Sequence, residues 1–454
     1  MKVGIIGGGA AGLAAAYQLT LMGHRPEVFE VAPFLGGQAS TFPIGGGQLE
    51  RGYHHLFVSD TDMADLIQEL GLGHQLHWLE SKVGLFHGGK IWNFATPLDL
   101  LRFRPLSLAQ RIRLGFWTFR LQKTTNWRQF QGITARDWIV RHMGEPAYRV
   151  IWEPMLRGKF GDYFDQVSMA WLWGKIYLRV ASRGKGMQKE RLGYPMGSFG
   201  EVFDRLGERI RQQGGEVHIS ARVNRVVVEQ DTATGLEVQL ENQEAEVRNY
   251  DAVLATTPSY VFTRLVPPLP PDYLEKLEQV DYLAAMVLIL GLDRPLSDRY
   301  WLNVADRSLP FVGIIEHTNL IDPGLYGGLH LVYLTNYPRR DSDLYRKSAE
   351  ELLEEFLPHL KRINPQFDRS WVQEYHHHRV DGAQPIIGVN YGARIPDHRT
   401  PFGNLYLANT TQIYPEDRGT NYSVRLGRRV ARMLVEDWEN SNRTAPLKER
   451  AEPL

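Results

Sequence analysis

Hydrophobic and polar positions follow a clear order at the start of the chain. The apolar run from Val3 to Ile6 predicts a short buried strand, and the Ala- and Leu-rich segment from Ala10 to Leu21 predicts a helix stopped by Gly23. The stretch PEVFE then predicts a second strand, which ends at Glu30. This order of strand, tight turn, helix and strand is typical of the first unit of a parallel α/β sheet.

Helical and strand patterns alternate through the middle of the chain. Residues 59–80 show a helical pattern with a glycine stop, and residues 97–138 show an aromatic-rich helical pattern. Residues 197–220 predict a helix, a Gly-Gly turn and a strand. Residues 221–258 alternate as a three-stranded ribbon that ends in an apolar strand.

The last third of the chain mixes both patterns. Residues 261–400 combine apolar strands with a helix predicted at 346–361. An apolar strand from Asn404 to Ala408 then precedes an amphipathic helix near the C-terminus. The apolar residues expected on its buried face recur every four positions: Tyr422, Leu426, Val430 and Leu434.

Composition narrows the function classes. A chain of 454 residues exceeds what one core usually fills, so two domains or one elaborated domain are expected. Equal numbers of basic and acidic residues, 52 each, argue against a general nucleic-acid binder. The absence of cysteine excludes disulfides, thiolate nucleophiles and iron–sulfur clusters. No signal-peptide pattern and no long apolar run occur, so we expect a cytoplasmic protein.

A glycine-rich turn follows the first predicted strand. Gly7, Gly9 and Gly12 fit the pattern G-x-G-x-x-G, in which glycines permit the turn, the approach of a pyrophosphate and close packing of the helix. The helix start offers free amides to the phosphates. Glu30 ends the second strand, where a carboxylate can accept hydrogen bonds from ribose hydroxyls. The agreement of strand, turn, helix and acid predicts a bound dinucleotide.

The residues after Glu30 bear on which dinucleotide is bound. A nicotinamide dehydrogenase would normally continue with further strand–helix units. Instead, Gly36 and Gly37 leave the backbone bare just beyond the second strand. The small or polar residues that follow, Gln38, Ala39 and Ser40, could contact a second set of phosphates and a ribityl chain.

At these positions the chain resembles the FAD-dependent oxidoreductases of the flavin amine oxidase, protoporphyrinogen oxidase and phytoene desaturase group. In that group the fingerprint is followed by an acid, a Gly-Gly motif and a segment acid-x-Gly-x-His, which Glu50, Gly52 and His54 match. The stretch GNLYLANTTQIYPEDRGTNYSVRLG matches the group's C-terminal strand, loop and helix. The chain departs from the group at Gln38, where many members have arginine, and at Asn409, where an acidic or glycine-rich position is common.

The resemblance implies an α/β fold with two interleaved domains. The Rossmann-like FAD-binding domain, a parallel sheet with helices plus a β-meander, would comprise residues 1–80, 195–260 and 400–440. A mixed α+β substrate domain, a helical cap plus a mixed sheet, would comprise 81–194 and 261–399. Because cysteine is absent, no cysteine-linked flavin is possible and we expect non-covalent FAD.

The resemblance also assigns candidate cofactor contacts. Val223 matches the position that contacts adenine, and Thr256 to Pro258 match the strand end that meets the flavin. The dipole of the C-terminal helix would stabilise negative charge on a reduced flavin; the alternative is a capped helix with surface ion pairs. The candidates are Gly7, Gly9, Ala10, Ala11, Gly12, Glu30, Gly36, Gly37, Gln38, Ala39, Ser40, Gly52, Tyr53, His54, Val223, Thr256, Thr257, Pro258, Asn409, Arg418, Gly419, Thr420, Asn421 and Tyr422.

Four residues are candidates for catalysis or substrate binding. Arg157 and Lys159, on a predicted glycine-flanked turn, could clamp an anionic substrate group, or could simply be surface charges. His54 and His55 could move a proton near neutral pH, or could be packed residues that orient the cofactor. Three consecutive histidines within residues 375–385 invite a metal, but neighbours on a strand point to opposite faces, so we expect none.

These features predict an oxidoreductase that takes hydride from a carbon–nitrogen or carbon–carbon bond of a small organic substrate. Without a second dinucleotide fingerprint, electrons would leave to oxygen, a quinone or an outside reductase. A sugar-nucleotide mutase, which shares the architecture, and a membrane-bound flavoprotein partner are the alternatives.

One segment raises the question of membrane contact. Residues 98–123 carry six Lys or Arg against one Asp, among Leu, Phe and Trp. A basic amphipathic helix of this kind can lie on an anionic bilayer, or can be a helical cap with a solvated basic face.

Overall fold

A five-stranded parallel sheet draws its strands from both ends and the middle of the chain. The computed structural model describes residues 1–181 and 190–444. The sheet has the order β10-β2-β1-β14-β20, and every neighbouring pair is parallel. The strands are β1 (Lys2–Ile6), β2 (Arg25–Phe29), β10 (Glu216–His218), β14 (Ala252–Ala255) and β20 (Leu405–Leu407). The predicted parallel sheet is confirmed.

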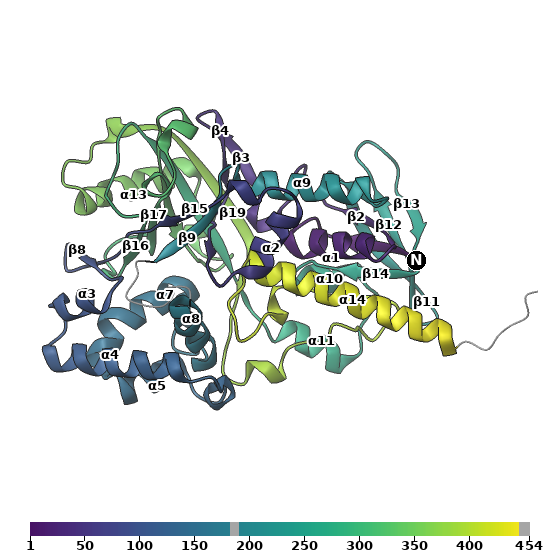
Figure 1. The fold of residues 1–454 in the computed structure, drawn as a ribbon, viewed down its shortest axis with the longest axis horizontal. Helices are drawn as coiled ribbons and strands as arrows, with labels where there is room; N and C mark the ends of the chain where they lie inside the picture. The colour runs from purple at the N-terminus through teal and green to yellow at the C-terminus, as the bar shows by residue number, and fades with distance from the viewer. Residues whose placement is uncertain (182–189, 445–454) are drawn as a thin grey trace, which may run out of the picture.

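Helices cover one face of this sheet. They are α1 (Ala10–Leu21), α2 (Thr61–Glu69), α9 (Ser198–Gln212) and the long α14 (Thr420–Thr444), which lies along α1 (Figure 1). The two helix backbones touch, since a Cβ on Gly427 would lie 2.1 Å from the carbonyl oxygen of Ala11. Helices from the two ends of the described chain thereby lie on one side of the sheet.

The predicted three-stranded ribbon covers the opposite face. It consists of β11 (Arg222–Glu229), β12 (Thr232–Gln239) and β13 (Glu246–Asn249). Successive residues of β14 alternate between the two cores: Leu254 packs on the helical side, and Val253 packs on the ribbon side. A strand covered on both faces has to be apolar throughout, which explains the uninterrupted hydrophobic run in the sequence.

A mixed seven-stranded sheet forms the other half of the molecule. Its order is β19-β15-β18-β17-β16-β7-β8. Met286, Leu288 and Leu290 of β15 pack against α13 (Ala349–Ile363), whereas Val287 and Ile289 point toward the core shared with the parallel sheet. The strands are β7 (Val83–His87), β8 (Lys90–Asn93), β15 (Tyr282–Leu292), β16 (Trp301–Val304), β17 (Gly313–Glu316), β18 (His330–Asn336) and β19 (Val372–Pro385).

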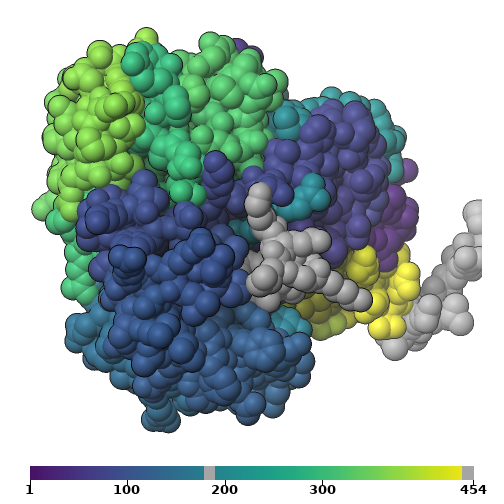
Figure 2. Space-filling view, turned by 60° about the vertical axis from the view of Figure 1, so that its left-hand side comes forward, coloured from purple at the N-terminus to yellow at the C-terminus, as the bar shows by residue number. Residues whose placement is uncertain are grey.

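A helical cap with a core of its own lies beside this sheet (Figures 1 and 2). It contains α3 (Pro97–Arg102), α4 (Leu108–Lys123), α5 (Ala135–His142), α7 (Glu153–Phe160) and α8 (Met169–Ala181). Thr96 and Ser107 form capping boxes at the starts of α3 and α4, which explains where these helices begin. None of the described helices combines the length and hydropathy needed to cross a bilayer.

Two local predictions are wrong. The helix predicted over residues 59–80 ends at Glu69, and Leu76–Glu80 is instead a strand, β6, that pairs with β9 (Arg191–Pro195). A positive φ at Gly71 ends the helical path, and the long-range pairing then selects the extended conformation. Arg157 and Lys159 lie within α7 and not on a turn, because the flanking glycine at 158 is helical.

The membership of the two large sheets supports the interleaved arrangement that the sequence suggests. We propose that residues 1–80, 195–260 and 400–440 form one domain. Residues 81–194 and 261–399 would form the other. The β6–β9 pairing lies at the boundary between them.

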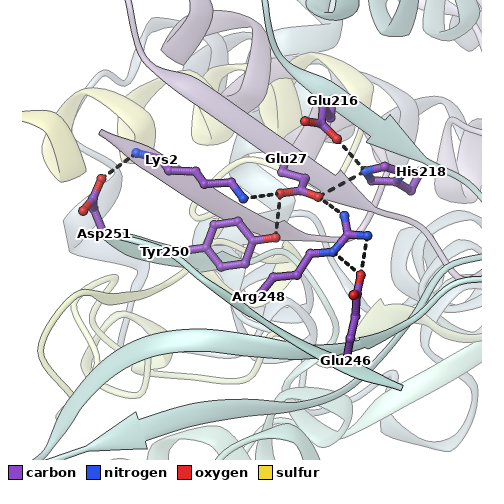
Figure 3. A network of polar contacts seen from close by, with 8 residues as sticks. All are labelled: Lys2, Glu27, Glu216, His218, Glu246, Arg248, Tyr250 and Asp251. Atoms are coloured by element: carbon purple, nitrogen blue, oxygen red, sulfur yellow. Dashed lines mark hydrogen bonds and ion pairs between the residues drawn. The ribbon is translucent and has the colours of Figure 1, made fainter. Parts of the chain in front are cut away.

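A buried polar network joins the ribbon to the parallel sheet (Figure 3). Glu27 of β2, whose side chain is 3% exposed, accepts hydrogen bonds from Tyr250 Oη at 2.7 Å and His218 Nε2 at 3.2 Å. Lys2 Nζ lies 3.1 Å away, and Arg248 also contacts the carboxylate. Burial opposes ionisation, but the four donors outweigh it and hold the pKa of Glu27 well below its usual range.

Candidate functional site

Glycines from two separate turns meet beyond the end of β1. Gly7 has φ +109°, and a Cβ on Gly12 would lie 2.0 Å from the Gly7 carbonyl oxygen, so only glycine fits the turn and the helix contact. Gly9 forms an isolated parallel bridge with Gly36. A Cβ on Gly37 would lie 3.1 Å from the Cα of Gly9. Bare backbone from both turns is therefore presented at one place.

The first helix begins directly at this surface. Ala10 and Ala11 open α1, whose N-cap Gly9 makes no side-chain capping bond. Glu30 accepts hydrogen bonds from the amides of Gly8 at 2.7 Å and Ala32 at 2.8 Å, one on each carboxylate oxygen. Each oxygen retains a lone pair for a further donor, as a ribose hydroxyl would provide. The geometry fits the nucleotide end of a dinucleotide.

The adenine-side candidate lies on the ribbon. The amide of Ala221 donates to the backbone carbonyl of Glu30 at 2.9 Å, which holds the start of β11 beside the acid. Val223 follows two residues later, half-buried, where the pairing of β11 with β12 is irregular.

The end of β14 is held by side-chain hydrogen bonds. Thr256 Oγ1 donates to the carbonyl of Ile6 at 2.9 Å. Asn409 Nδ2 donates to the carbonyl of Thr257 at 3.1 Å, and its Oδ1 accepts from Thr411. The amide of Asn409 thus binds protein groups at both ends, and we propose that it positions the strand end leading to Pro258. The departure from the family pattern at residue 409 has this structural use.

The Gly-Gly turn continues as a short 3-10 helix over Gly37–Ala39, which Ser40 ends. Gln38 lies beside Arg418: Arg418 Nη1 donates to Gln38 Oε1 at 3.1 Å, and Gln38 Nε2 donates to the carbonyl of Gly382 at 3.2 Å. An arginine at residue 38 would place a second guanidinium against Arg418. This contact explains why Gln38 replaces the arginine that many members of the group carry at this position.

Arg418 connects the Gly-Gly turn to residues of the seven-stranded sheet and its flanking loop. Its Nε donates to Gln384 Oε1 at 3.0 Å, and its Nη2 lies 3.4 Å from Tyr337 Oη. Tyr337 Oη is 3.0 Å from Tyr53 Oη. Burial raises the pKa of Tyr53 well above its usual value, so this phenol remains protonated.

The segment acid-x-Gly-x-His lies where the two large sheets meet. Glu50 is fully buried and accepts hydrogen bonds from Tyr194 Oη at 3.0 Å and from the amide of Phe199 at 2.9 Å. Its carbonyl accepts from Tyr333 Oη at 2.8 Å. Burial raises the pKa of Glu50 to about 7, because these partners are neutral. A Cβ on Gly52 would meet no atom within 4 Å among the described residues, so the backbone is open there.

The two histidines have different partners. His54 Nδ1 lies 2.6 Å from the carbonyl of Gly52, so Nδ1 carries the proton that it donates. Burial lowers the pKa of His54 to about 4, which leaves the ring neutral at pH 7. His55 Nδ1 lies 2.9 Å from Tyr300 Oη. His54 therefore has the geometry of an orienting residue, with Nε2 as a hydrogen-bond acceptor.

Arg157 and Lys159 diverge, as residues two apart on a helix must. Arg157 Nη2 lies 3.1 Å from Glu153, and the guanidinium covers the ring of Phe164 at 3.6 Å. Lys159 Nζ lies 2.8 Å from Asp417, 258 residues away in the sequence. The two cations do not form the clamp that the sequence suggests.

The cation that joins Lys159 is Lys175, whose Nζ lies 2.5 Å from the same Asp417. Trp171 Nε1 donates to Asp417 at 3.1 Å. Burial opposes ionisation, but Lys159, Lys175 and the neighbouring Arg418 hold the pKa of Asp417 well below its usual range. Three cations and one carboxylate leave excess positive charge here. Sequence spacing gave no signal for Lys175 or Asp417, although Asp417 adjoins the predicted Arg418.

The start of α14 completes the site. Gly419 precedes the first residue, Thr420, and Tyr422 packs against the main core. Asn421 is 2% exposed, and its Oδ1 accepts from the amide of Met63 at 2.9 Å.

Two buried polar atoms test whether these residues fit a flavin dinucleotide. Within residues 1–181 and 190–444, neither Thr257 Oγ1 nor Asn421 Nδ2 has a hydrogen-bond partner, although both are buried. One lies at the end of β14 and the other at the start of α14, and buried groups of this kind normally find partners. Together with the bare glycine backbone and Glu30, they fit a cofactor that runs between the two helix starts.

Comparison with known proteins agrees with this geometry. The profile described as flavin containing amine oxidoreductase matches residues 10–434. The chain belongs to this family. The resemblance read from the sequence is confirmed, and the protein is a flavin-dependent oxidoreductase with a Rossmann-like α/β fold.

Individual relatives are distant. The 15-cis-phytoene desaturase of Capsicum annuum is 23% identical over 97% of this chain and 78% of its own length. Putrescine oxidase bound to putrescine has a TM-score of 0.72 at 17% identity, covering 96% of this chain and 99% of that one. Reduced UDP-galactopyranose mutase has a TM-score of 0.71 at 15% identity, covering 96% and 94%. The two structural likenesses establish the fold.

Among the described residues, one group has the spacing of metal ligands. Glu27, Glu216 and His218 place ligand atoms within 4.8 Å of one another. Lys2 and Arg248 already contact Glu27, however. Their positive charge opposes a metal ion, so we assign none to this position.

Proposed function

We propose that this flavin-dependent oxidoreductase removes a hydride from a carbon–nitrogen or carbon–carbon bond of a small organic substrate. The observation that carries the proposal is that the two glycine turns, Glu30 and the end of β14 are linked: Gly9 pairs with Gly36, Glu30 accepts from Gly8, and Thr256 donates to Ile6. FAD bound there without a covalent link would supply the electron-accepting ring. Electrons would then pass to an outside acceptor such as oxygen, a quinone or a reductase.

The residues of the chain would divide the work of holding FAD. The amides at the start of α1 and the bare backbone at Gly9 and Gly37 would face the pyrophosphate. Glu30 would bind the adenine-side ribose. At the flavin end, Asn421 Nδ2 would donate a hydrogen bond, and Thr257 Oγ1 would donate or accept one. The start of α14 would place positive dipole charge near the pyrimidine.

The uncharged aromatic side chains around Tyr53 are consistent with a substrate that is oxidised by loss of hydride. Tyr53 lies edge-on to Trp301 at 4.9 Å between ring centroids and 6.2 Å from Tyr333. His54 and Tyr53 both remain uncharged at neutral pH, as their pKa shifts indicate. Such walls would exclude water and orient an apolar part of the substrate, while Lys159 and Lys175 would attract an anionic part.

Anaerobic reduction tests the proposal. Purified protein should show flavin absorbance, which should bleach when an amine, a porphyrinogen or a polyene substrate is added without oxygen. The variant Thr257→Val should weaken flavin binding, whereas Thr232→Val, at the half-buried start of β12, serves as the matched control. A colourless protein that binds no added FAD would contradict the proposal at its first step.

A sugar-nucleotide mutase is the alternative with no net redox change. Its motivating feature was an Arg157–Lys159 clamp for a diphosphate, and these residues have separate partners. Isomerisation of a nucleotide sugar by chemically reduced protein, without consumption of electrons, would decide in favour of the mutase.

A further inference from the structure

The helical cap exposes large apolar side chains on two consecutive helices. Of the fourteen exposed large hydrophobic residues among the described residues, six belong to α3 and α4, each 48% to 58% exposed. They are Leu98, Leu101, Leu108, Ile112, Phe116 and Phe119. We call these six residues the apolar face of the cap. The others are spread over the rest of the surface, as single exposed apolar residues commonly are.

The pattern on α4 shows that this exposure is organised. Leu108, Ile112, Phe116 and Phe119 follow one another at intervals of four, four and three, which places them on one side of the helix. Leu114 and Leu121, at 3% and 1% exposure, face the core of the cap. The helix therefore has two apolar sides, one packed and one facing outward.

Charge along the apolar face is predominantly positive. Its one acid, Asp99, accepts hydrogen bonds from the amides of Ala95 and Thr96 at the start of α3. Residues 100–134 contain seven Lys or Arg and no Asp or Glu, in a chain whose net charge is zero. Arg111 donates to the carbonyl of Leu101, and Arg113 Nη2 donates to that of Arg141 at 2.8 Å, so these two hold the cap together. The other four cations on the two helices and their connection are exposed: Arg102, Arg104, Arg120 and Lys123.

We propose that the apolar face docks the protein on an anionic lipid surface. An exposed apolar stripe flanked by Lys and Arg suits a helix lying at the boundary between headgroups and acyl chains. Anionic lipid also supplies the opposite charge that the four exposed cations attract. A second copy of the chain is a poorer match, because a two-fold contact would set this basic surface against itself.

Vesicle flotation of the full-length, flavin-loaded protein tests the proposal. The protein should float with vesicles of phosphatidylcholine containing phosphatidylglycerol, much less with phosphatidylcholine alone, and binding should weaken as salt rises. The double variant Phe116→Ser, Phe119→Ser should lower binding at least about tenfold through lost apolar burial. Neutralising Arg102, Arg104, Arg120 and Lys123 to Gln should lower it by at least about tenfold through lost attraction.

Matched variants distinguish docking from general stickiness. Ile219→Ser, Val247→Ser removes two exposed apolar residues outside the cap, one directly after β10 and one on β13, and should leave flotation unchanged. Flavin absorbance and circular dichroism should stay as in the wild type for every variant. Wild-type protein that floats with neither vesicle, or a control pair that loses as much as the cap pair, would overturn the proposal. So would light scattering that shows a dimer dissolved by Phe116→Ser, Phe119→Ser with flotation unaltered.

Discussion

Glu27 and Glu50 are both buried glutamates, but they occupy two regions with opposite electrostatics. Glu27 lies in the parallel sheet among Lys2, Arg248, His218 and Tyr250, and its pKa is held well below its usual range. Glu50 lies where the two large sheets meet, among phenols and backbone amides, and burial raises its pKa to about 7. One carboxyl is permanently charged, and the other changes charge near physiological pH.

The difference shows how partners, more than depth, decide the state of a buried acid. Cations close to a carboxylate compensate for its lost hydration, whereas neutral donors compensate only in part. The charged network joins the ribbon to the sheet next to the proposed nucleotide end of the site, since the amide of Glu30 donates to the carbonyl of His218 at 2.9 Å. The titratable acid adjoins the segment that carries Gly52 and His54, where a change of charge would be felt by the cofactor.

The largest effect is expected from breaking the charged network. Glu27→Ala would leave Lys2 and Arg248 without their buried partner, and should lower the free energy of unfolding by about 3–5 kcal/mol. Denaturant titration measures this change. Glu246→Ala, which removes an exposed partner of the same arginine, should cost less than about 1 kcal/mol. Equal losses from the two variants would show that the buried position of Glu27 adds nothing to its ion pairs.

The second prediction concerns the pH dependence due to Glu50. Because its folded pKa is about 7 and its ordinary value is 4.5, the unfolded chain releases this proton first as pH rises. The contribution of Glu50 to stability should therefore fall between pH 4.5 and 7, by about 3 kcal/mol in total. Unfolding free energies at several pH values should show a shallower slope for Glu50→Gln.

Other buried acids should keep part of the pH dependence of stability in the Glu50→Gln variant. Burial also raises the pKa of Glu316 to about 7 and that of Asp60 to about 6, so the slope should not vanish in Glu50→Gln. Glu241→Gln, at an exposed position after β12, is the control and should leave the profile as in the wild type. An unchanged slope in Glu50→Gln would mean that Glu50 is ionised in the folded protein.

The third prediction concerns Glu30, whose replacement should affect FAD binding. Glu30→Ala should weaken FAD binding to the apoprotein roughly ten- to hundredfold, or about 1–3 kcal/mol, through loss of the ribose acceptor. Fluorescence titration with FAD measures the affinity. Glu229→Ala, at the far end of β11, should bind FAD as the wild type does. Wild-type affinity in Glu30→Ala would place the nucleotide elsewhere.

The smallest effects are expected from replacing either of the two lysines that pair with Asp417. Lys159→Met or Lys175→Met alone should change the unfolding free energy by about 1 kcal/mol, because the other lysine still pairs with the carboxylate. The double variant should lose more than the sum of the two, and a double-mutant cycle by denaturant titration gives the excess. Strict additivity would show that the two cations do not share Asp417.

Much of the parallel sheet and its glycine turns could be predicted, since each depends on neighbouring residues. The order of strand, turn and helix from Val3 to Leu21 follows from local hydrophobic pattern and the need for glycine at Gly7 and Gly12. The strand Leu76–Glu80 was missed because its partner, β9, lies over a hundred residues away. The turn expected around Arg157 was wrong because one glycine does not end a helix whose other residues pack well.

The sequence by itself determined the family, the parallel sheet and the glycine turns, because these depend on short-range geometry and composition. Only the tertiary structure decided which polar groups meet: Lys159 pairs with Asp417 and forms no clamp with Arg157, and Gln38 faces Arg418. It also decided that α4 exposes an apolar side. Electrostatic and packing energies depend on distance in space and on water excluded by distant segments. Neither quantity can be read from separation along the chain.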